Sequence, residues 1–367
     1  MKDKKRHQIN KIGSGSLAEQ SFKYWEIFLS WLFKYPSRCY ELELAKTAQV
    51  FENPCDALYR LGQSYRATAA SKGIICQVTN NAADLDRVND ALKNIYTYIV
   101  HPTLSDLAIA EVLAKVVAYR ELCQGNKLAI PSRQPNGEMA LTFYSVDTVF
   151  DLWNRIRAFG LTSSSQLFAP PILLFRGTDF SLRSKGGRAS IISDLDPKGP
   201  GWAVFEKAEP TLQNWLKTQG KRKTRLIGHS LGGAIVSYTL IKEFCFINPH
   251  DYACSYAFNF PGISDQLFKQ WNALPSEQKP AFKGVVCRGD VVSKFGKLFG
   301  DIFEVSLPAP LSPITAHELL LFAEPLCYLH RVALAKENNS PSRNFYSKMQ
   351  QQTSSLIYEF GLKFLFP

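Results

Sequence analysis

The sequence lacks the features of a membrane-spanning, metal-binding or disulfide-linked secreted protein. None of its 367 residues fall in an uninterrupted apolar run near the roughly 18 to 20 residues that a membrane-spanning helix requires. The first residues, MKDKKRHQINKIGSGS, have no apolar segment directly after their charges, so no ordinary secretory signal is visible. The eight cysteines form no C-x-x-C pair, and the histidines do not cluster at metal-ligand spacing. We therefore expect free thiols in a reducing compartment, no metal and no cofactor.

Nucleic-acid-binding motifs and internal repeats are also missing, although the formal net charge is +11. The excess charge is compatible with peripheral contact with anionic membranes, and a solvated basic surface is the alternative; no nucleic-acid partner is expected. The segment 22–36, FKYWEIFLSWLFKYP, is an expected core helix, with an interfacial helix as the alternative. The protein is expected to be cytoplasmic or exported without a classical signal peptide, and no feature bears on its oligomeric state. Basic residues form two clusters along the chain. One lies in the N-terminal tail and the other just before the serine motif: Lys2, Lys4, Lys5, Arg6 and Lys11 in the first, and Lys221, Arg222, Lys223 and Arg225 in the second.

The pattern along the chain changes near residue 136. A basic tail, 1–18, precedes a region, 19–135, that is expected to be helical. Turn-forming residues at 123–138 indicate its boundary with a third part, 136–367. The expected helices are 19–34, 38–52, 54–71, 84–99 and 103–123.

Short apolar strands alternate with helices beyond the boundary, which indicates an α/β fold with a mostly parallel sheet covered on both faces. Helices are expected over 147–159, 211–220 and from residue 233 onward. Strands are expected over 139–146, 171–175, 224–227, 254–260, 283–289 and 301–308.

The stretch RLIGHSLGGAIVSYTL, residues 225–240, carries the strongest chemical signal. A nucleophilic serine must project from a strained turn between a strand and a helix, and flanking glycines remove the collisions that side chains would cause there. Ser230 has Gly228 and Gly232 at these positions, with His229 inside the motif. The amide of Leu231 would then lie at the positive end of a helix, where it can donate to a developing oxyanion.

A serine nucleophile of this kind needs a base and an acid, which follow it in the chain in α/β-hydrolases. His317 is favoured as the base because it follows the last expected strand, where Thr315 and Glu318 form a capping box. His330, expected in a helix, is the alternative base, and His250 comes third. Asp290 is favoured as the acid because it follows the strand KGVVCRG at its carboxyl end. Asp265 is the alternative acid; Asp251 and Asp301 are the other available acids.

The strand end F-R-G-T, residues 175–178, precedes G-H-S-L-G-G-A by about fifty residues. With the later segments YAFNFPGISDQLF and VVCRGDVVSKF, this arrangement resembles the class 3 (fungal-type) lipases, which are α/β-hydrolases. The resemblance covers roughly residues 139–325. It implies Ser230 as nucleophile, Asp290 as acid and His317 as base. It further implies that Thr178 and the Leu231 amide donate to the oxyanion.

The sequence departs from the family pattern at several positions. Gly201 and Trp202 replace the usual Gly-Phe segment without its preceding histidine, Asn259 stands where glycine is common, and no proline follows Asp290. The segment 179–201 corresponds to the lid of such lipases, with a basic half and an apolar patch. The resemblance implies hydrolysis of a lipid ester: a glyceride, phospholipid or sterol ester. The alternatives are a thioesterase or small-ester hydrolase and a non-catalytic partner-binding protein.

Overall fold

The computed structural model describes residues 42–44, 49–52, 58–63, 82–99, 101–120, 122–152, 156–163, 169–177, 199–290, 292–311 and 313–334. These residues belong to one compact unit, Cys39–Ala335. Several sequence predictions fall outside them: the basic tail 1–18, the segments 19–34 and 22–36, Thr178, and residues 179–198 of the expected lid. Within the described ranges, no helix has the length and the apolar character that crossing a membrane requires.

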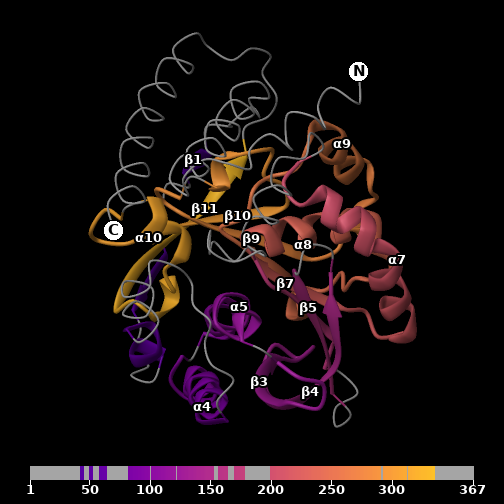
Figure 1. Cartoon of the computed structure of the whole chain (residues 1–367). Helices are drawn as coiled ribbons and strands as arrows, with labels where there is room; N and C mark the ends of the chain where they lie inside the picture. Colours follow the sequence, from indigo (N-terminus) through magenta and orange to yellow (C-terminus); the bar gives the residue numbers. More distant parts are fainter. Residues whose placement is uncertain are drawn as a thin grey trace, which may run out of the picture. The chain divides into compact units, whose positions relative to one another are not determined.

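A β-sheet forms the centre of this unit (Figure 1). It consists of eleven described strands. Its order is β1-β11-β10-β9-β8-β7-β6-β5-β4-β3, and β2 also pairs with β11. The strands are β1 (Leu42–Leu44), β2 (Gln49–Glu52), β3 (Lys127–Arg133), β4 (Met139–Asp151), β5 (Arg157–Thr162), β6 (Ile172–Phe175), β7 (Arg225–His229), β8 (Ser255–Phe258), β9 (Phe282–Cys287), β10 (Asp301–Ser306) and β11 (Leu326–Leu334).

The sheet is mixed, with a parallel centre. Neighbouring strands from β6 to β10 pair in parallel, whereas β3 to β6 on one side and β10, β11, β1 and β2 on the other pair antiparallel. The α/β-hydrolase fold expected from the sequence is confirmed, but parallel pairing is confined to the centre of the sheet. The carboxyl ends of β6 to β9 meet at one edge, where ligands of open α/β sheets bind.

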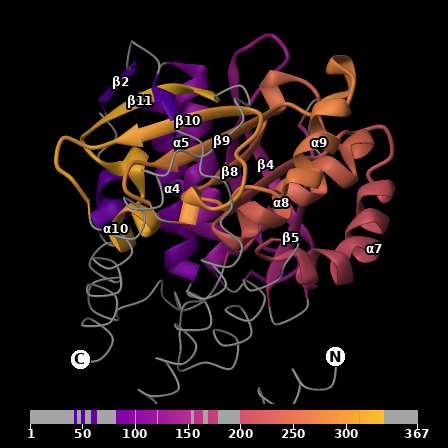
Figure 2. The same cartoon turned by 90° about the horizontal axis from the view of Figure 1, so that it is seen from above.

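Alternating side chains divide the core into two layers. Leu174 and Ile227 lie in one buried cluster, whereas their neighbours Leu173 and Leu226 lie in the other. The helices α4 (Ala82–Tyr98) and α5 (Pro102–Lys115) contribute to the first cluster. The second includes residues of α7 (Trp202–Thr218), α8 (Leu231–Lys242) and α9 (Asp265–Ala273). Figures 1 and 2 show these two groups of helices on opposite faces of the sheet.

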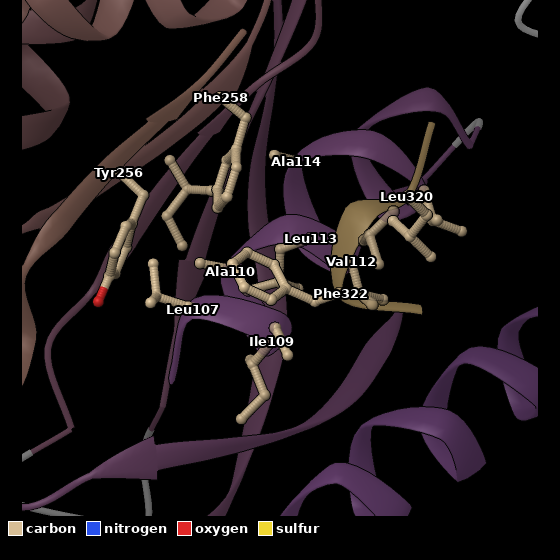
Figure 3. Packing of buried hydrophobic residues seen from close by; sticks show 14 of the residues in the cluster. Leu107, Ile109, Ala110, Val112, Leu113, Ala114, Tyr256, Phe258, Leu320 and Phe322 are labelled. Carbon is tan, nitrogen blue, oxygen red and sulfur yellow. The ribbon is translucent and has the colours of Figure 1, made fainter. Parts of the chain in front are cut away.

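Helix α5 is almost entirely enclosed, with every residue from Leu104 to Lys115 buried. In Figure 3 it lies between Tyr256 and Phe258 of β8 and the segment that carries Leu320 and Phe322. A charge that is buried in the core needs a partner, and the buried polar residues of α5 find theirs in other buried groups. Asp106 lies 2.8 Å from Arg225 of β7 and accepts a hydrogen bond from the hydroxyl of Tyr256. The region 19–135 therefore does not stand apart from the sheet where it is described: α4, α5 and β3 are parts of the same unit.

Two of the predicted helices are wrong. Residues 42–44 and 49–52, within the predicted helix 38–52, are strands that pair with β11. The predicted helix 147–159 is occupied by the end of β4 and the start of β5, which pair with each other. In both places, pairing with distant or neighbouring strands overrides a local helical pattern. The helix predicted over 103–123 is confirmed as α5, but it ends at Lys115 and a short turn, η1 (Val117–Tyr119), follows.

Candidate active site

The turn that carries Ser230 connects the parallel strand β7 to helix α8, which is the strand–turn–helix arrangement expected from the sequence. Ser230 has φ of 56° and ψ of −126°, a conformation that L-residues rarely adopt. Its N–H donates to the carbonyl of Phe258 at the end of β8 at 2.9 Å. The surrounding hydrogen bonds therefore hold a strained serine at the carboxyl edge of the sheet.

The glycines of the turn allow this close approach. A Cβ atom on Gly228 would lie 2.5 Å from the carbonyl oxygen of Gly232. One on Gly232 would lie 2.6 Å from the carbonyl oxygen of Phe175, which ends β6. Both contacts are with backbone atoms that cannot rotate away, so the turn requires glycine at both positions.

His317 lies beside this serine. It is carried by α10 (Pro313–Glu318), and its Nε2 atom is 2.9 Å from Oγ of Ser230. Its Nδ1 atom lies 3.0 Å from Oδ1 of Asp290. A carboxylate only accepts, so Nδ1 carries the proton and Nε2 is free to accept from the serine hydroxyl. The structure thus brings together the three residues that the sequence analysis selected.

Asp290 is fully buried at the carboxyl end of β9. Besides the His317 imidazole, its carboxylate accepts from the backbone N–H groups of Val292 at 2.9 Å and Ser293 at 3.3 Å. These donors compensate for the loss of water and keep the carboxylate aimed at His317.

The edge around Ser230 also has the elements of an oxyanion site. Leu231 is the first residue of α8, so its N–H has no acceptor within the helix and lies at the positive end of the helix dipole. The loop after β6 reaches the same turn, since a Cβ atom on Gly177 would lie 3.2 Å from Cβ of Ser230. Thr178, the second expected donor, lies outside the described residues.

His229 supports the base from the other side of the turn. Its Nε2 atom donates to the backbone carbonyl of His317 at 2.9 Å, and its Nδ1 atom accepts from the hydroxyl of Tyr119 at 3.1 Å. Burial, together with the neighbouring His317 and Lys115, lowers the pKa of His229 well below its ordinary value. His229 is therefore a neutral structural link between the η1 turn and the segment of His317.

Tyr119 and Asn259 are the contributors that the sequence analysis did not assign to the site. Asn259 donates to the carbonyls of Ala316 and His317, both at 2.8 Å. The sequence signal for Asn259 was its departure from the glycine that is common in the family. Tyr119 gave no such signal, because it lies 110 positions before its partner His229.

The alternative acids and bases lie in other surroundings. Asp265 is 64% exposed and pairs with Lys297 at 2.7 Å. His330 belongs to β11 rather than to the predicted helix, and its ring is 3.5 Å from the hydroxyl of Ser306. His250 is exposed and stacks on Tyr252. Asp251 pairs with Arg133 and Lys283, and Asp301 pairs with Arg331.

The expected capping box is wrong, because α10 begins at Pro313 and Thr315 lies inside it. The helix nevertheless presents His317 in its last turn. Among the described residues, no three or more histidine, cysteine, aspartate or glutamate side chains are grouped as metal ligands.

Comparison with known proteins finds a matching family model for part of the chain. Residues 174–299 match the family model described as lipase (class 3). This part of the chain is similar to the class 3 lipases. The resemblance stated from the sequence is therefore confirmed. No curated protein matches the chain.

Solved lipase structures also resemble this chain. A triacylglycerol lipase from Penicillium expansum is 17% identical, with 55% of this chain and 79% of that chain covered and a TM-score of 0.37. The Lip2 lipase from Yarrowia lipolytica is 14% identical, with coverage of 62% and 84% and a TM-score of 0.35. A deletion mutant of the Rhizomucor miehei lipase propeptide complex is 12% identical, with coverage of 83% and 92% and a TM-score of 0.36.

Proposed function

We propose that the protein hydrolyses carboxylic esters of lipids with Ser230 as nucleophile, His317 as general base and Asp290 as the acid that orients it. The observation that carries the proposal is the continuous contact from the Asp290 carboxylate through the imidazole to the Ser230 hydroxyl, at 3.0 and 2.9 Å. These distances are within reach for proton transfer, and the strained turn places the buried serine at the carboxyl edge of the sheet.

The geometry supports a two-step reaction through an acyl-enzyme. In the first step, Ser230 Oγ attacks the ester carbonyl carbon while its proton passes to Nε2 of His317. The resulting oxyanion accepts from the Leu231 N–H, with Thr178 as the second donor implied by the family resemblance. Collapse breaks the ester C–O bond, and His317 gives its proton to the leaving alcohol.

Water completes the cycle. It gives a proton to His317 as its oxygen attacks the acyl carbon, and collapse returns the proton to Ser230 Oγ and releases the fatty acid. Asp290 keeps its charge throughout and stabilises the imidazolium that forms in each step. The net reaction consumes one ester and one water and yields one acid and one alcohol.

The substrate proposed is the acyl ester of a glyceride, phospholipid or sterol, presented at an interface. The lipase family supports a lipid ester as a class. The net charge of +11 supports an anionic surface as the preferred one. Hydrolysis that is equally fast on neutral and anionic vesicles, and insensitive to salt, would contradict this preference.

Labelling with a fluorophosphonate tests the nucleophile directly. We expect a single site of labelling at Ser230, mapped by mass spectrometry, that disappears in Ser230→Ala together with activity on a panel of glyceride, phospholipid, sterol and thioester substrates. A folded wild-type protein that stays unlabelled with and without anionic vesicles would overturn the proposal. Faster turnover of the thioester than of every lipid ester would make the protein a thioesterase.

A further inference from the structure

Glycine could adopt the same backbone conformation as Asn259. Asn259 follows β8, has φ of 46°, and is fully buried. Asparagine is among the few residues other than glycine that tolerate this left-handed region. The backbone conformation therefore does not explain why a buried amide side chain is present, so the explanation must lie in what the amide contacts.

The Asn259 amide bridges the two segments that carry the candidate acid and base. Its Oδ1 atom accepts from the N–H of Cys287 at 2.9 Å, at the end of β9. The carbonyl of the same Cys287 accepts from the N–H of Asp290 at 3.0 Å. On the other side, Nδ2 of Asn259 donates to the carbonyls of Ala316 and His317, both at 2.8 Å. One planar group thus spans the gap between the acid-bearing turn and the base-bearing helix.

These bonds constrain the base at its backbone. The carbonyl of His317 accepts from Asn259 Nδ2 and also from His229 Nε2 at 2.9 Å, which uses both of its lone pairs. The Asn259 backbone N–H donates to the carbonyl of Val285 at 2.8 Å, which fixes the amide relative to β9. Short hydrogen bonds to rigid strands leave α10 little freedom to move away from Asp290.

We propose that Asn259 is a positioning residue that sets the separation between Asp290 and His317. This inference rests on the proposed function, because it assigns Asn259 a role in the reaction of the same site. Asn259 does not touch the reacting atoms: it acts through the backbone of Cys287, Ala316 and His317. A displacement of a catalytic group by about 1 Å can cost on the order of 100-fold in rate, so the constraint bears directly on turnover.

Asn259→Gly is the informative variant, because glycine accepts the same φ and removes only the amide bridge. We expect kcat for a lipid ester to fall about 10- to 100-fold with KM nearly unchanged, and fluorophosphonate labelling of Ser230 to slow by a similar factor. We also expect the downfield NMR resonance of the His317 Nδ1 proton, which reports the bond to Asp290, to shift or broaden. A residue with a merely structural role would leave this resonance in place in the folded protein.

Asn248→Gly is the matched control. Asn248 is also a buried asparagine, and its Oδ1 accepts from the N–H of His250 at 2.9 Å, before β8 and therefore at the opposite edge of the sheet. We expect this variant to retain wild-type kcat and the wild-type resonance. Asn259→Asp provides a second test should Asn259→Gly not fold, since aspartate keeps the acceptor for Cys287 and loses both donors.

The outcomes separate this inference from the proposed function. The first case is a wild-type protein that hydrolyses lipid esters. If a folded Asn259→Gly or Asn259→Asp variant then keeps kcat within twofold of the wild-type value, Asn259 is not a positioning residue. The same conclusion holds if kcat falls equally in Asn248→Gly, or if it falls while the His317 resonance is unchanged. An unlabelled and inactive wild type overturns the proposed function itself, and with it this inference.

Discussion

The Nζ atom of Lys115 lies 2.9 Å from Oε1 of Glu111, and both side chains are withdrawn from solvent. The pair also binds the chain just after His317. Lys115 donates to the carbonyl of Leu319 at 2.7 Å, and Glu111 accepts from the N–H groups of Leu321 and Phe322 at 2.8 Å each. Helix α5 therefore anchors the segment that follows the candidate base.

Breaking this buried pair should destabilise the protein strongly. We expect Glu111→Gln to lower the free energy of unfolding by about 3–5 kcal/mol, because it leaves the Lys115 charge buried without its counterion. Denaturant titration of purified variants measures the change. The pair of the exposed Arg331 and the partly exposed Asp301 provides the control: Arg331→Ala should cost less than about 1 kcal/mol. Equal effects in the two variants would show that the buried pair has no special structural role.

Replacing Asp290 tests the orientation of the imidazole. In Asp290→Asn the amide can donate to Nδ1 of His317, which moves the imidazole proton to Nε2 and removes the acceptor for the Ser230 hydroxyl. We expect kcat to fall by about four orders of magnitude with the fold intact, as measured by ester hydrolysis and circular dichroism. Asp265→Asn is the control because its carboxylate is exposed and bonds to Lys297. If the loss appears in Asp265→Asn instead, the acid has been assigned to the wrong residue.

The turn at Ser230 could be predicted because its requirements are local. Strand, serine, flanking glycines and helix occupy one short stretch, and the collisions that exclude side chains at Gly228 and Gly232 involve residues of the turn and the end of β6. The positions of Asp290 and His317 followed from chain order and from their place at loop ends. The structure puts both beside Ser230, where the labelling experiment and the Asp290 variant test their roles.

Long-range contacts were beyond prediction from one sequence. The strand β2 exists because it pairs with β11, which lies nearly three hundred residues later in the chain. Likewise, Lys115 bonds to a carbonyl 204 positions away, and Asn259 bonds to one 58 positions away. Composition and periodicity describe neighbours along the chain, whereas these residues obtain their partners only when the sheet is assembled. The helical pattern of 38–52 misled for the same reason.

The pH dependence of stability should report the buried His229. Its pKa is lowered in the folded state, mainly by burial, while the unfolded side chain titrates near pH 6.5. Below about pH 6.5 the unfolded chain therefore binds more protons at this site, so folding stability falls as pH falls. The contribution reaches about 1.4 kcal/mol for each pH unit below 6.5 until the folded side chain also protonates.

His229→Gln should remove this contribution, because glutamine does not titrate there. We expect the free energy of unfolding, measured by urea titration at pH 7.5 and at pH 5.5, to fall less between the two values in the variant than in the wild type, by up to about 1.4 kcal/mol. His250→Gln is the control for the replacement of a histidine by glutamine, because His250 is exposed and lies away from the candidate active site. A slope in His229→Gln that equals the wild-type slope would mean that His229 takes up its proton in the folded protein over the same pH range as in the unfolded chain. Its Nε2–H could then still donate to His317, but Nδ1 would no longer accept from Tyr119.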